Sequence, residues 1–338
     1  MRMKGHSTKK SNSPALAQKV QILLEEKGKK ALEIAKKTLL EEQKKIESQE
    51  VKEALNYFMN EYWHDVARPA LLSITCEAAG GKPEITTSIA VPMILISGAV
   101  DIHDDIIDKS EEKYGKPTVY GKFGEDIAIL VGDALLFKGL LLLHRIENVS
   151  EEKRKIIVKT INDMFFELGD AEALEFKFRQ CAVPSPEEYL RVMRKKAADV
   201  EAHTRIAAIL GNAREKEIEK FSQYGRLLGM LIILRDEILD LMTIDELKNR
   251  ITKEHLPLPT AYAFQNTEIR PELKKIFKKK KLTERDVKLI QEFTEKGGGI
   301  DASKKLMKKL ALEASSLIKH AKNNRNDLTM LIKCMLRF

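Results

Sequence analysis

Apolar residues recur every three or four positions along most of the chain, with glutamate and lysine between them. The stretch ALAQKVQILLEEKGKKALEIAKKTLLEEQKKI, residues 15–46, keeps this spacing throughout, and strand-like alternation is nearly absent. Such spacing places apolar side chains on one face of an α-helix. The pattern therefore predicts an all-α protein of about ten or more helices.

The breaks between the predicted helices are short, and no linker rich in proline, glycine and serine divides the chain. Each break is followed by another helix whose apolar face must pack against a neighbour. We therefore expect one domain, residues 14–338, built as a helical bundle around a central apolar cavity. Residues 1–13 are basic and polar and are expected to form a flexible tail.

One predicted helix changes from apolar to acidic along its length. Residues 88–100 carry no charge, and the next eight residues contain Asp101, Asp104, Asp105 and Asp108. In a helix these four positions share one face over two turns. Because like charges repel at this spacing, a positive partner is expected. A buried helix that ends in carboxylates indicates the wall of an apolar cavity with a charged rim.

The same pattern occurs again in GRLLGMLIILRDEILDLM, where the uncharged residues 227–234 precede Asp236, Glu237 and Asp240. Two such helices could face each other across a bundle core. Carboxylates without histidine or cysteine suit magnesium, with manganese as the alternative. Magnesium usually shares its coordination with substrate phosphates, so the residues favour a metal-bound diphosphate at the mouth of an apolar pocket. Metal ions there would stabilise a departing diphosphate and so promote ionisation of an allylic substrate.

The remaining composition narrows the class of protein. The formal net charge is +8, but the densest basic run, residues 274–281, has no interleaved aromatic ladder, and no nucleic-acid partner is expected. The longest uncharged stretch, residues 85–100, is shorter than the roughly 20 residues of a membrane-spanning helix. The three cysteines have no paired spacing. We expect a protein of the reducing cytoplasm that does not span a membrane.

The segments IHDDIIDKS (102–110), GKPTVYGKFG (115–124) and AILVGDALL (128–136) resemble, in this order, the first aspartate-rich motif of the trans-prenyl diphosphate synthases and the helix after it. A weaker resemblance extends over residues 50–270. It implies the isoprenoid synthase fold and magnesium held by two groups of side chains, Asp104, Asp105 and Asp108 on one side and Asp236, Glu237 and Asp240 on the other. It also implies that Lys196 and Lys253 contact the diphosphate of an allylic prenyl diphosphate.

The sequence departs from this family mainly where isopentenyl diphosphate would bind. In WHDVARP, residues 63–69, Asp65 stands at the position of a lysine and Val66 at that of an arginine, and only Arg68 is retained. After the first motif, Lys113 replaces an arginine. The resemblance therefore leaves Arg68 and Lys113 as contacts for isopentenyl diphosphate, and it makes use of this substrate uncertain.

Three interpretations follow. The first is a geranylgeranyl-type polyprenyl diphosphate synthase that adds isopentenyl diphosphate to an allylic substrate. The second is a terpene-synthase-like enzyme that cyclises or quenches the allylic cation without an acceptor. The third is a non-catalytic partner subunit. The retained carboxylates favour an enzyme, and the family's usual activity favours the first interpretation.

Smaller features refine these expectations. Val100 and Ala99 lie four and five residues before Asp104, where bulky aromatic residues limit product length in the family. Small residues there imply room for a long prenyl chain, although helix packing alone would also explain them. Asp101 either extends the metal site or has a structural role, which we favour. The resemblance further implies a homodimer.

Overall fold

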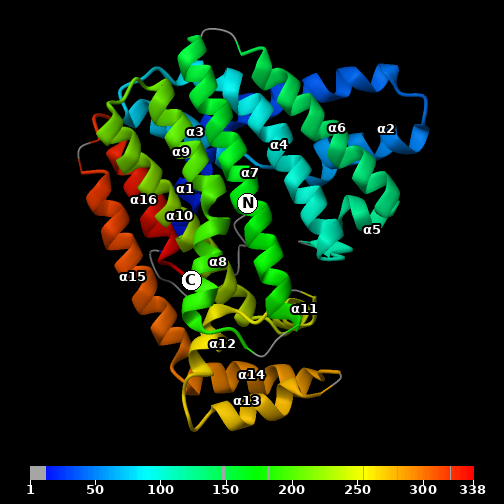
Figure 1. The fold of residues 1–338 in the computed structure, drawn as a ribbon, viewed down its shortest axis with the longest axis vertical. Helices are drawn as coiled ribbons and strands as arrows, with labels where there is room; N and C mark the ends of the chain where they lie inside the picture. The colour runs from blue at the N-terminus through cyan, green and yellow to red at the C-terminus, as the bar shows by residue number, and fades with distance from the viewer. Residues whose placement is uncertain are drawn as a thin grey trace. The chain divides into compact units, whose positions relative to one another are not determined.

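The computed structural model describes residues 13–113, 115–146, 149–180, 183–253, 255–279, 281–319 and 321–338. The predicted tail, residues 1–13, lies outside these ranges except for Ser13, the first residue of α1. The prediction of an all-α protein is confirmed (Figure 1). Within the described ranges, β structure is limited to one antiparallel pair of two-residue strands.

The chain forms two compact units, which are described separately. Unit 1 comprises residues 1–159, 206–218 and 321–324, and unit 2 comprises residues 160–205, 219–320 and 325–338. The single domain predicted for residues 14–338 stays a prediction. Three helices contribute residues to both units: α7 (Glu151–Gln180), α9 (Ala198–Leu210) and α10 (Glu215–Leu241).

Unit 1 is built around two apolar helices, α4 (Thr87–Ile107) and α6 (Glu125–His144). Its other elements are α1 (Ser13–Glu42), η1 (Gln43–Lys45), α2 (Gln49–Asn56), the π-helix η2 (Tyr57–Tyr62), α3 (Ala67–Ala78), η3 (Pro83–Thr86), β1 (Glu112–Lys113), β2 (Lys116–Pro117) and α5 (Val119–Phe123).

Helix α4 is the predicted helix of residues 88–108, found within one residue of its expected ends. Every residue from 89 to 99 is buried, as its uncharged sequence predicts. Helix α6 lies beside it (Figure 1), and two glycines on α6 allow the close approach. A Cβ atom at Gly139 would lie 2.6 Å from Ile96 Cγ1, and one at Gly132 would lie 2.6 Å from His103 Nε2.

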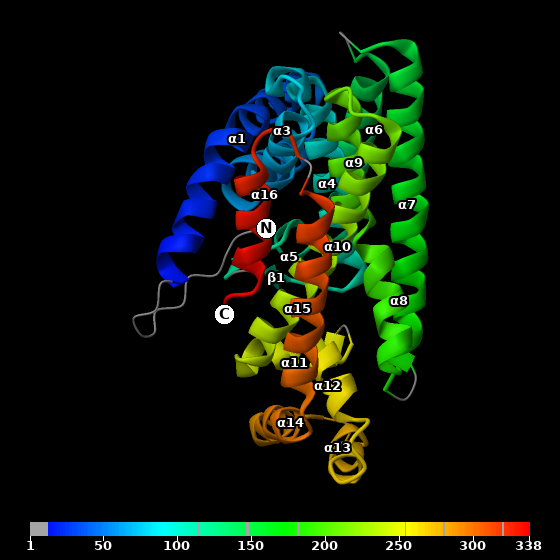
Figure 2. The ribbon, with the colours of Figure 1, turned by 90° about the vertical axis from the view of Figure 1, so that its left-hand side faces the viewer.

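Unit 2 contains the remaining helices: α8 (Pro186–Lys196), α11 (Ile244–Lys253), α12 (Leu258–Ala263), α13 (Arg270–Phe277), α14 (Glu284–Lys296), α15 (Gly299–Leu317) and α16 (Arg325–Met335). Helices α11 to α14 lie near one another (Figure 2), and they share a core cluster that includes Leu247, Leu273, Ile276 and Val287. Capping boxes begin α8 and α14, so the starts of these helices are fixed by local sequence.

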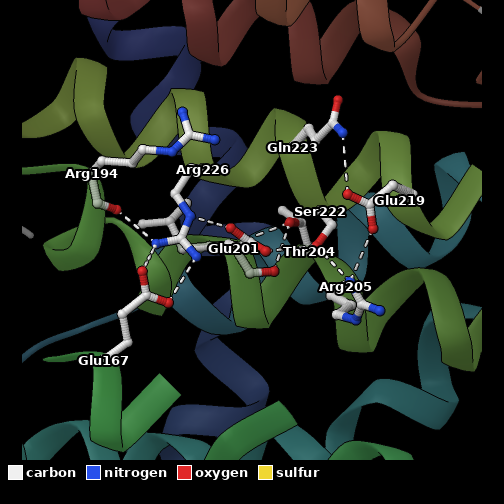
Figure 3. Close-up of polar contacts among 10 residues, drawn as sticks. Glu167, Arg194, Glu201, Thr204, Arg205, Glu219, Ser222, Gln223 and Arg226 are labelled. Carbon is white, nitrogen blue, oxygen red and sulfur yellow. Dashed lines mark hydrogen bonds and ion pairs between the residues drawn. The ribbon is translucent and has the colours of Figure 1, made fainter. Parts of the chain in front are cut away.

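One arginine of α10 ties together four helices of unit 2 (Figure 3). Arg226 makes a bidentate contact with Glu167 of α7, at 2.7 Å from Nη1 and 3.0 Å from Nη2. It also donates to Glu201 of α9 and, over 2.7 Å, to the carbonyl oxygen of Arg194 near the end of α8. Its side chain is 12% exposed, so these ion pairs are only weakly screened by water.

Candidate functional site

The first aspartate group, Asp104, Asp105 and Asp108, lies where α4 ends. Asp104 and Asp105 belong to the last turn, and Asp108 is the C-cap residue. Asp105 is only 2% exposed, and the other two are half-buried. The C-terminal end of a helix carries partial negative charge, which disfavours carboxylates. The group therefore requires a nearby cation.

Lys113 supplies a cation to this group. Lys109, in the left-handed conformation with φ of 51°, ends the helix, and β1 and β2 then form a short hairpin. The hairpin places Lys113 Nζ 3.2 Å from Asp104 Oδ2 and 2.7 Å from Asp105 Oδ1. Although burial alone would lower it, these two carboxylates raise the pKa of Lys113 above its ordinary value. One ammonium group thus lies between two carboxylates.

Asp105 retains capacity for a further cation. Its burial, opposed by Lys113 and reinforced by Asp104, raises the pKa of Asp105 to about 7. Its contact with Lys113 through Oδ1 is an ion pair without hydrogen-bond geometry, and that oxygen is buried. The donor set consists of hard carboxylate oxygens, which fit magnesium. Among the described residues, no three histidine, cysteine or acidic side chains already converge as a metal cluster.

The altered segment of residues 63–69 forms a polar network beside this group. Asp65 is 1% exposed, and its Oδ1 accepts the backbone N–H groups of Ala67 and Arg68, at 2.9 and 3.2 Å, where α3 begins. Its Oδ2 lies 2.6 Å from Arg68 Nη1. Burial alone would raise the pKa of Asp65, but Arg68 and these hydrogen bonds lower it to about 2. The charge reversal at Asp65 is therefore compensated inside the chain.

Asp101 joins the same network. Its Oδ2 accepts the indole N–H of Trp63 over 2.7 Å, and its Oδ1 lies 3.7 Å from Arg68 Nη2. Trp63 in turn stacks on Phe58, with ring centroids 5.3 Å apart. These contacts support the structural role that we favour for Asp101, which stays a prediction. They also mean that Arg68, expected to contact isopentenyl diphosphate, already faces two carboxylates.

The second acidic group, Asp236, Glu237 and Asp240, lies near the end of α10 in unit 2. The side chain of Asp236 is 52% exposed, whereas Glu237 is fully buried. Glu237 accepts the hydroxyl of Tyr189 and, over 3.0 Å, the backbone N–H of Leu258 at the start of α12. Both its oxygens are thus engaged within the protein. Glu237 is therefore less suited to bind a metal ion than Asp236 and Asp240.

Arg250 pairs with two members of the second acidic group. Its Nη1 lies 2.8 Å from Asp240 Oδ2, and its Nη2 lies 3.7 Å from Glu237 Oε1. The arginine comes from α11, one turn before the end of that helix. The sequence motifs gave no indication of this pairing.

The two lysines expected at the diphosphate lie at the ends of helices in unit 2. Lys196 is the last residue of α8, and its Nζ contacts Glu175 and lies 3.0 Å from Glu172 Oε1. Lys253 is the last residue of α11, and its side chain lies outside the described part of the structure. Sequence reasoning missed Glu175, since a glutamate within a long charged helix carries no distinguishing signal.

Ala99 and Val100 lie about one turn before the first aspartate group on α4. Ala99 is fully buried and Val100 is half-buried. His103, on the same helix, lies 3.4 Å from Asp133 of α6 through its Nε2 atom. This histidine therefore bridges the two apolar helices of unit 1.

The polyprenyl synthetase family model matches residues 48–294. The chain is 33% identical over 180 residues to the short chain isoprenyl diphosphate synthase of Methanothermobacter thermautotrophicus, covering 53% of this chain and 55% of the relative. It is 31% identical over 185 residues to the geranylgeranyl diphosphate synthase of Methanosarcina mazei, covering 54% and 57%. The chain thus spans about half the length of these curated relatives.

The fold extends the similarity over nearly the whole chain. The crystal structure of geranylgeranyl pyrophosphate synthetase from Pyrococcus horikoshii Ot3 superposes with a TM-score of 0.83 at 27% identity, covering 95% of this chain and 99% of that one. The all-α architecture is the isoprenoid synthase fold. On the family match and this fold, the chain belongs to the polyprenyl synthetase family.

Proposed function

We propose that the chain is a magnesium-dependent trans-polyprenyl diphosphate synthase of the geranylgeranyl type. It ionises an allylic prenyl diphosphate and joins the cation to isopentenyl diphosphate. The observation that carries the proposal is the convergence of Asp104 and Asp105 on one cation, Lys113, at the end of a helix buried over residues 89–99. An apolar wall that ends in hard oxygen donors matches a prenyl tail and its metal-bound diphosphate.

In this proposal Asp104, Asp105 and Asp108 hold magnesium in unit 1, and Asp236 and Asp240 hold it in unit 2. Manganese, which takes similar ligands, is the alternative. Bound magnesium would neutralise the charge that develops on the departing diphosphate. Glu237 is assigned a different role from the one expected, because its oxygens anchor Tyr189 and the start of α12.

The basic residues are proposed to bind the two diphosphates. Lys196 and Lys253 contact the allylic diphosphate, as their positions in the family pattern imply. Arg68 and Lys113 contact isopentenyl diphosphate, and each must exchange an existing carboxylate partner to do so. The buried residues of α4 exclude water from the cation, and small residues at Ala99 and Val100 leave room for a long product.

Product analysis tests the proposal directly. Purified protein is incubated with magnesium and geranyl, farnesyl or geranylgeranyl diphosphate, each with and without isopentenyl diphosphate, and all products are identified by mass. A longer diphosphate that forms only with isopentenyl diphosphate supports chain elongation. No turnover of any substrate would overturn the proposal and favour a non-catalytic partner subunit.

One observation favours a second candidate function. Arg68 is the one basic residue of the isopentenyl diphosphate motif that is retained in the altered segment, residues 63–69. It already pairs with Asp65 and Asp101. An enzyme that cyclises or quenches the allylic cation needs no acceptor and would tolerate this arrangement. Hydrocarbons or alcohols formed without isopentenyl diphosphate, in the same assay, would identify this activity.

We also propose a homodimer that forms through α6. This helix exposes an apolar face made by residues of similar helical angle, Ile129, Leu130, Phe137, Leu140 and Leu141, which are 40–67% exposed. Exposed apolar patches of this kind mark interaction surfaces, and a second copy of the chain buries such a face symmetrically. Light scattering after size exclusion should give twice the monomer mass, and Phe137→Glu should shift it toward the monomer.

Two apolar segments, which include α4 and α6, are relevant to whether the protein spans a membrane. The segments 83–107 and 125–144 are long and apolar enough to cross a membrane, but 72% and 33% of their respective windows are buried inside the protein. We propose that both belong to the folded core and its interface, and that the protein does not span a membrane. Cys76 is a buried free thiol, which suits a reducing cytoplasm.

We expect no nucleic-acid partner. In the basic run of residues 274–281, Lys275 pairs with Glu272 over 2.7 Å and Lys279 pairs with Asp286 over 2.5 Å. These internal ion pairs reduce the positive charge that the run offers to a polyanion. Retention on heparin at physiological salt would contradict this expectation.

A further inference from the structure

A buried carboxylate of unit 2 is shared between two basic side chains. Glu175, near the C-terminal end of α7, is 3% exposed. Its Oε2 contacts the ammonium of Lys196, and its Oε1 contacts Nε2 of His255, which lies in the segment between α11 and α12. Burial alone would raise the pKa of Glu175, but His255 and Lys196 lower it below its ordinary value. The carboxylate is therefore held ionised by both partners.

The ring of His255 is fixed on every side. Its Nδ1 lies 3.0 Å from the carbonyl oxygen of Leu256, which can only accept, so Nδ1 carries a hydrogen. The same nitrogen lies 3.1 Å from the hydroxyl of Tyr189, which itself donates to Glu237. The Tyr189 ring packs edge-on against the histidine, with centroids 5.1 Å apart. Because His255 is 7% exposed, it cannot turn away without breaking these contacts.

This geometry has a consequence for Lys196. A carboxylate with two basic partners divides its attraction between them, whereas a carboxylate with one partner holds that partner more tightly. If the histidine were withdrawn, Glu175 would direct its attraction to Lys196 instead of dividing it between two partners. The lysine ammonium would then be less available to an incoming anion.

We propose that His255 is a positioning residue for Lys196: by engaging one oxygen of Glu175, it keeps the lysine ammonium available to a diphosphate group. This inference rests on the proposed function, in which Lys196 contacts the allylic diphosphate. It assigns to a histidine outside the sequence motifs a role in binding the anionic end of the substrate, exerted through Glu175.

The test measures binding of inorganic diphosphate in the presence of magnesium by titration calorimetry. The variants are His255→Gln, Lys196→Met and the double variant, and His203→Gln is the matched control. His203 is also buried in unit 2, at 1% exposed, and faces a carboxylate, Asp199, over 3.2 Å. We expect His255→Gln to weaken binding about tenfold and His203→Gln to change it less than twofold.

The double variant shows whether His255 acts by positioning Lys196 or whether its replacement disturbs the fold in general. Since His255 acts through the lysine, adding His255→Gln to Lys196→Met should change the dissociation constant less than twofold. An equal tenfold loss in both backgrounds would overturn the proposal, as would unchanged binding by His255→Gln. Circular dichroism checks folding, and His255→Asn, a shorter amide, is measured beside it and must show the same loss.

The wild-type titration distinguishes this inference from the proposed function. A wild-type chain that binds no diphosphate would overturn both. A wild-type chain that binds diphosphate, while His255→Gln binds it equally well, would overturn only the role of His255.

Discussion

Replacing Glu237 by glutamine tests whether this residue binds a metal ion or is a buried anchor, that is, a residue that holds Tyr189 and the start of α12 in place. The carboxylate is fully buried and accepts two hydrogen bonds, from Tyr189 and from the backbone N–H of Leu258. A hydrogen bond to a charged group contributes about 1.5–3 kcal/mol, against about 0.5–1.5 kcal/mol between neutral groups. Glutamine loses the charge in both bonds and must turn its NH2 group toward one of the donors. We therefore expect the free energy of unfolding to fall by about 3 kcal/mol.

Urea denaturation measures this loss, and a thermal melt checks it. With an unfolding entropy of about 2.1 cal/mol/K per residue, a loss of about 3 kcal/mol lowers the Tm of a 338-residue chain by about 4 °C. The magnesium affinity of the folded variant, measured by calorimetry with inorganic diphosphate present, should stay within about threefold of wild type, because the ligands of unit 2 are proposed to be Asp236 and Asp240.

The matched control is the neighbouring residue. Asp236→Asn replaces a side chain that is 52% exposed, so the free energy of unfolding should change by less than about 0.5 kcal/mol. Magnesium binding should weaken about tenfold or more, since a hard anionic ligand is lost. If Glu237→Gln instead keeps its stability and loses magnesium binding, the anchor role is refuted and the family pattern alone gives the correct assignment.

Three further predictions concern other charged contacts. Lys113→Met should tighten Mn²⁺ binding severalfold in electron paramagnetic resonance titrations without diphosphate, because its ammonium competes for two carboxylates of the first aspartate group; weaker binding would count against this. Asp65 has a folded pKa of about 2 against an ordinary 3.8, so it stabilises above pH 3.8 and loses this contribution as the pH falls through 2. Asp65→Asn should therefore cost about 2 kcal/mol at pH 6 in urea denaturation, and a gap between the two proteins that does not narrow toward pH 2.5 would refute the linkage to Arg68. Arg226→Met should lower the free energy of unfolding by about 3 kcal/mol, whereas Arg205→Met, at a more exposed ion pair, should lower it by less than about 1 kcal/mol. Equal losses would contradict the larger contribution expected of the Arg226 contacts in Figure 3.

The sequence predicts α4 well because a helix that is buried on all sides has an uninterrupted run of uncharged residues. Residues 88–100 carry no charge, and the observed helix, Thr87–Ile107, has every residue from 89 to 99 buried. The aspartates at its end follow from the same pattern. The position of Lys113 does not, because it depends on a left-handed residue at Lys109 and on a hairpin of two-residue strands. Such turns are set by backbone geometry that spacing alone does not encode.

The second acidic group was only partly predictable. Adjacent residues on a helix point about 100° apart, so Asp236 and Glu237 cannot share one environment. The structure exposes the first and buries the second. Which of the two faces inward depends on the helices that pack around α10, and this information is spread over the whole chain. A motif that treats the acids as equivalent therefore misses the anchor.

Ion pairs between residues that are distant in the chain could not be predicted from the sequence. Glu175 lies on α7 and His255 lies between α11 and α12, far apart in the sequence, and each occurs among residues of ordinary helical or loop composition. By contrast, Asp65 and Arg68 are three residues apart at the start of a helix, a spacing that permits a local ion pair. Their pairing could be anticipated, but the nearly complete burial of Asp65 could not.

The most direct test of the central claim is the magnesium dependence of prenyl transfer, measured as incorporation of radiolabelled isopentenyl diphosphate into farnesyl diphosphate by the wild-type chain and by Asp105→Asn. The account predicts incorporation that rises with magnesium, disappears on addition of EDTA, and falls at least about a hundredfold when the carboxylate of Asp105 is removed. Incorporation that survives EDTA, or that Asp105→Asn supports at the wild-type rate, would contradict the claim that the first aspartate group holds the metal.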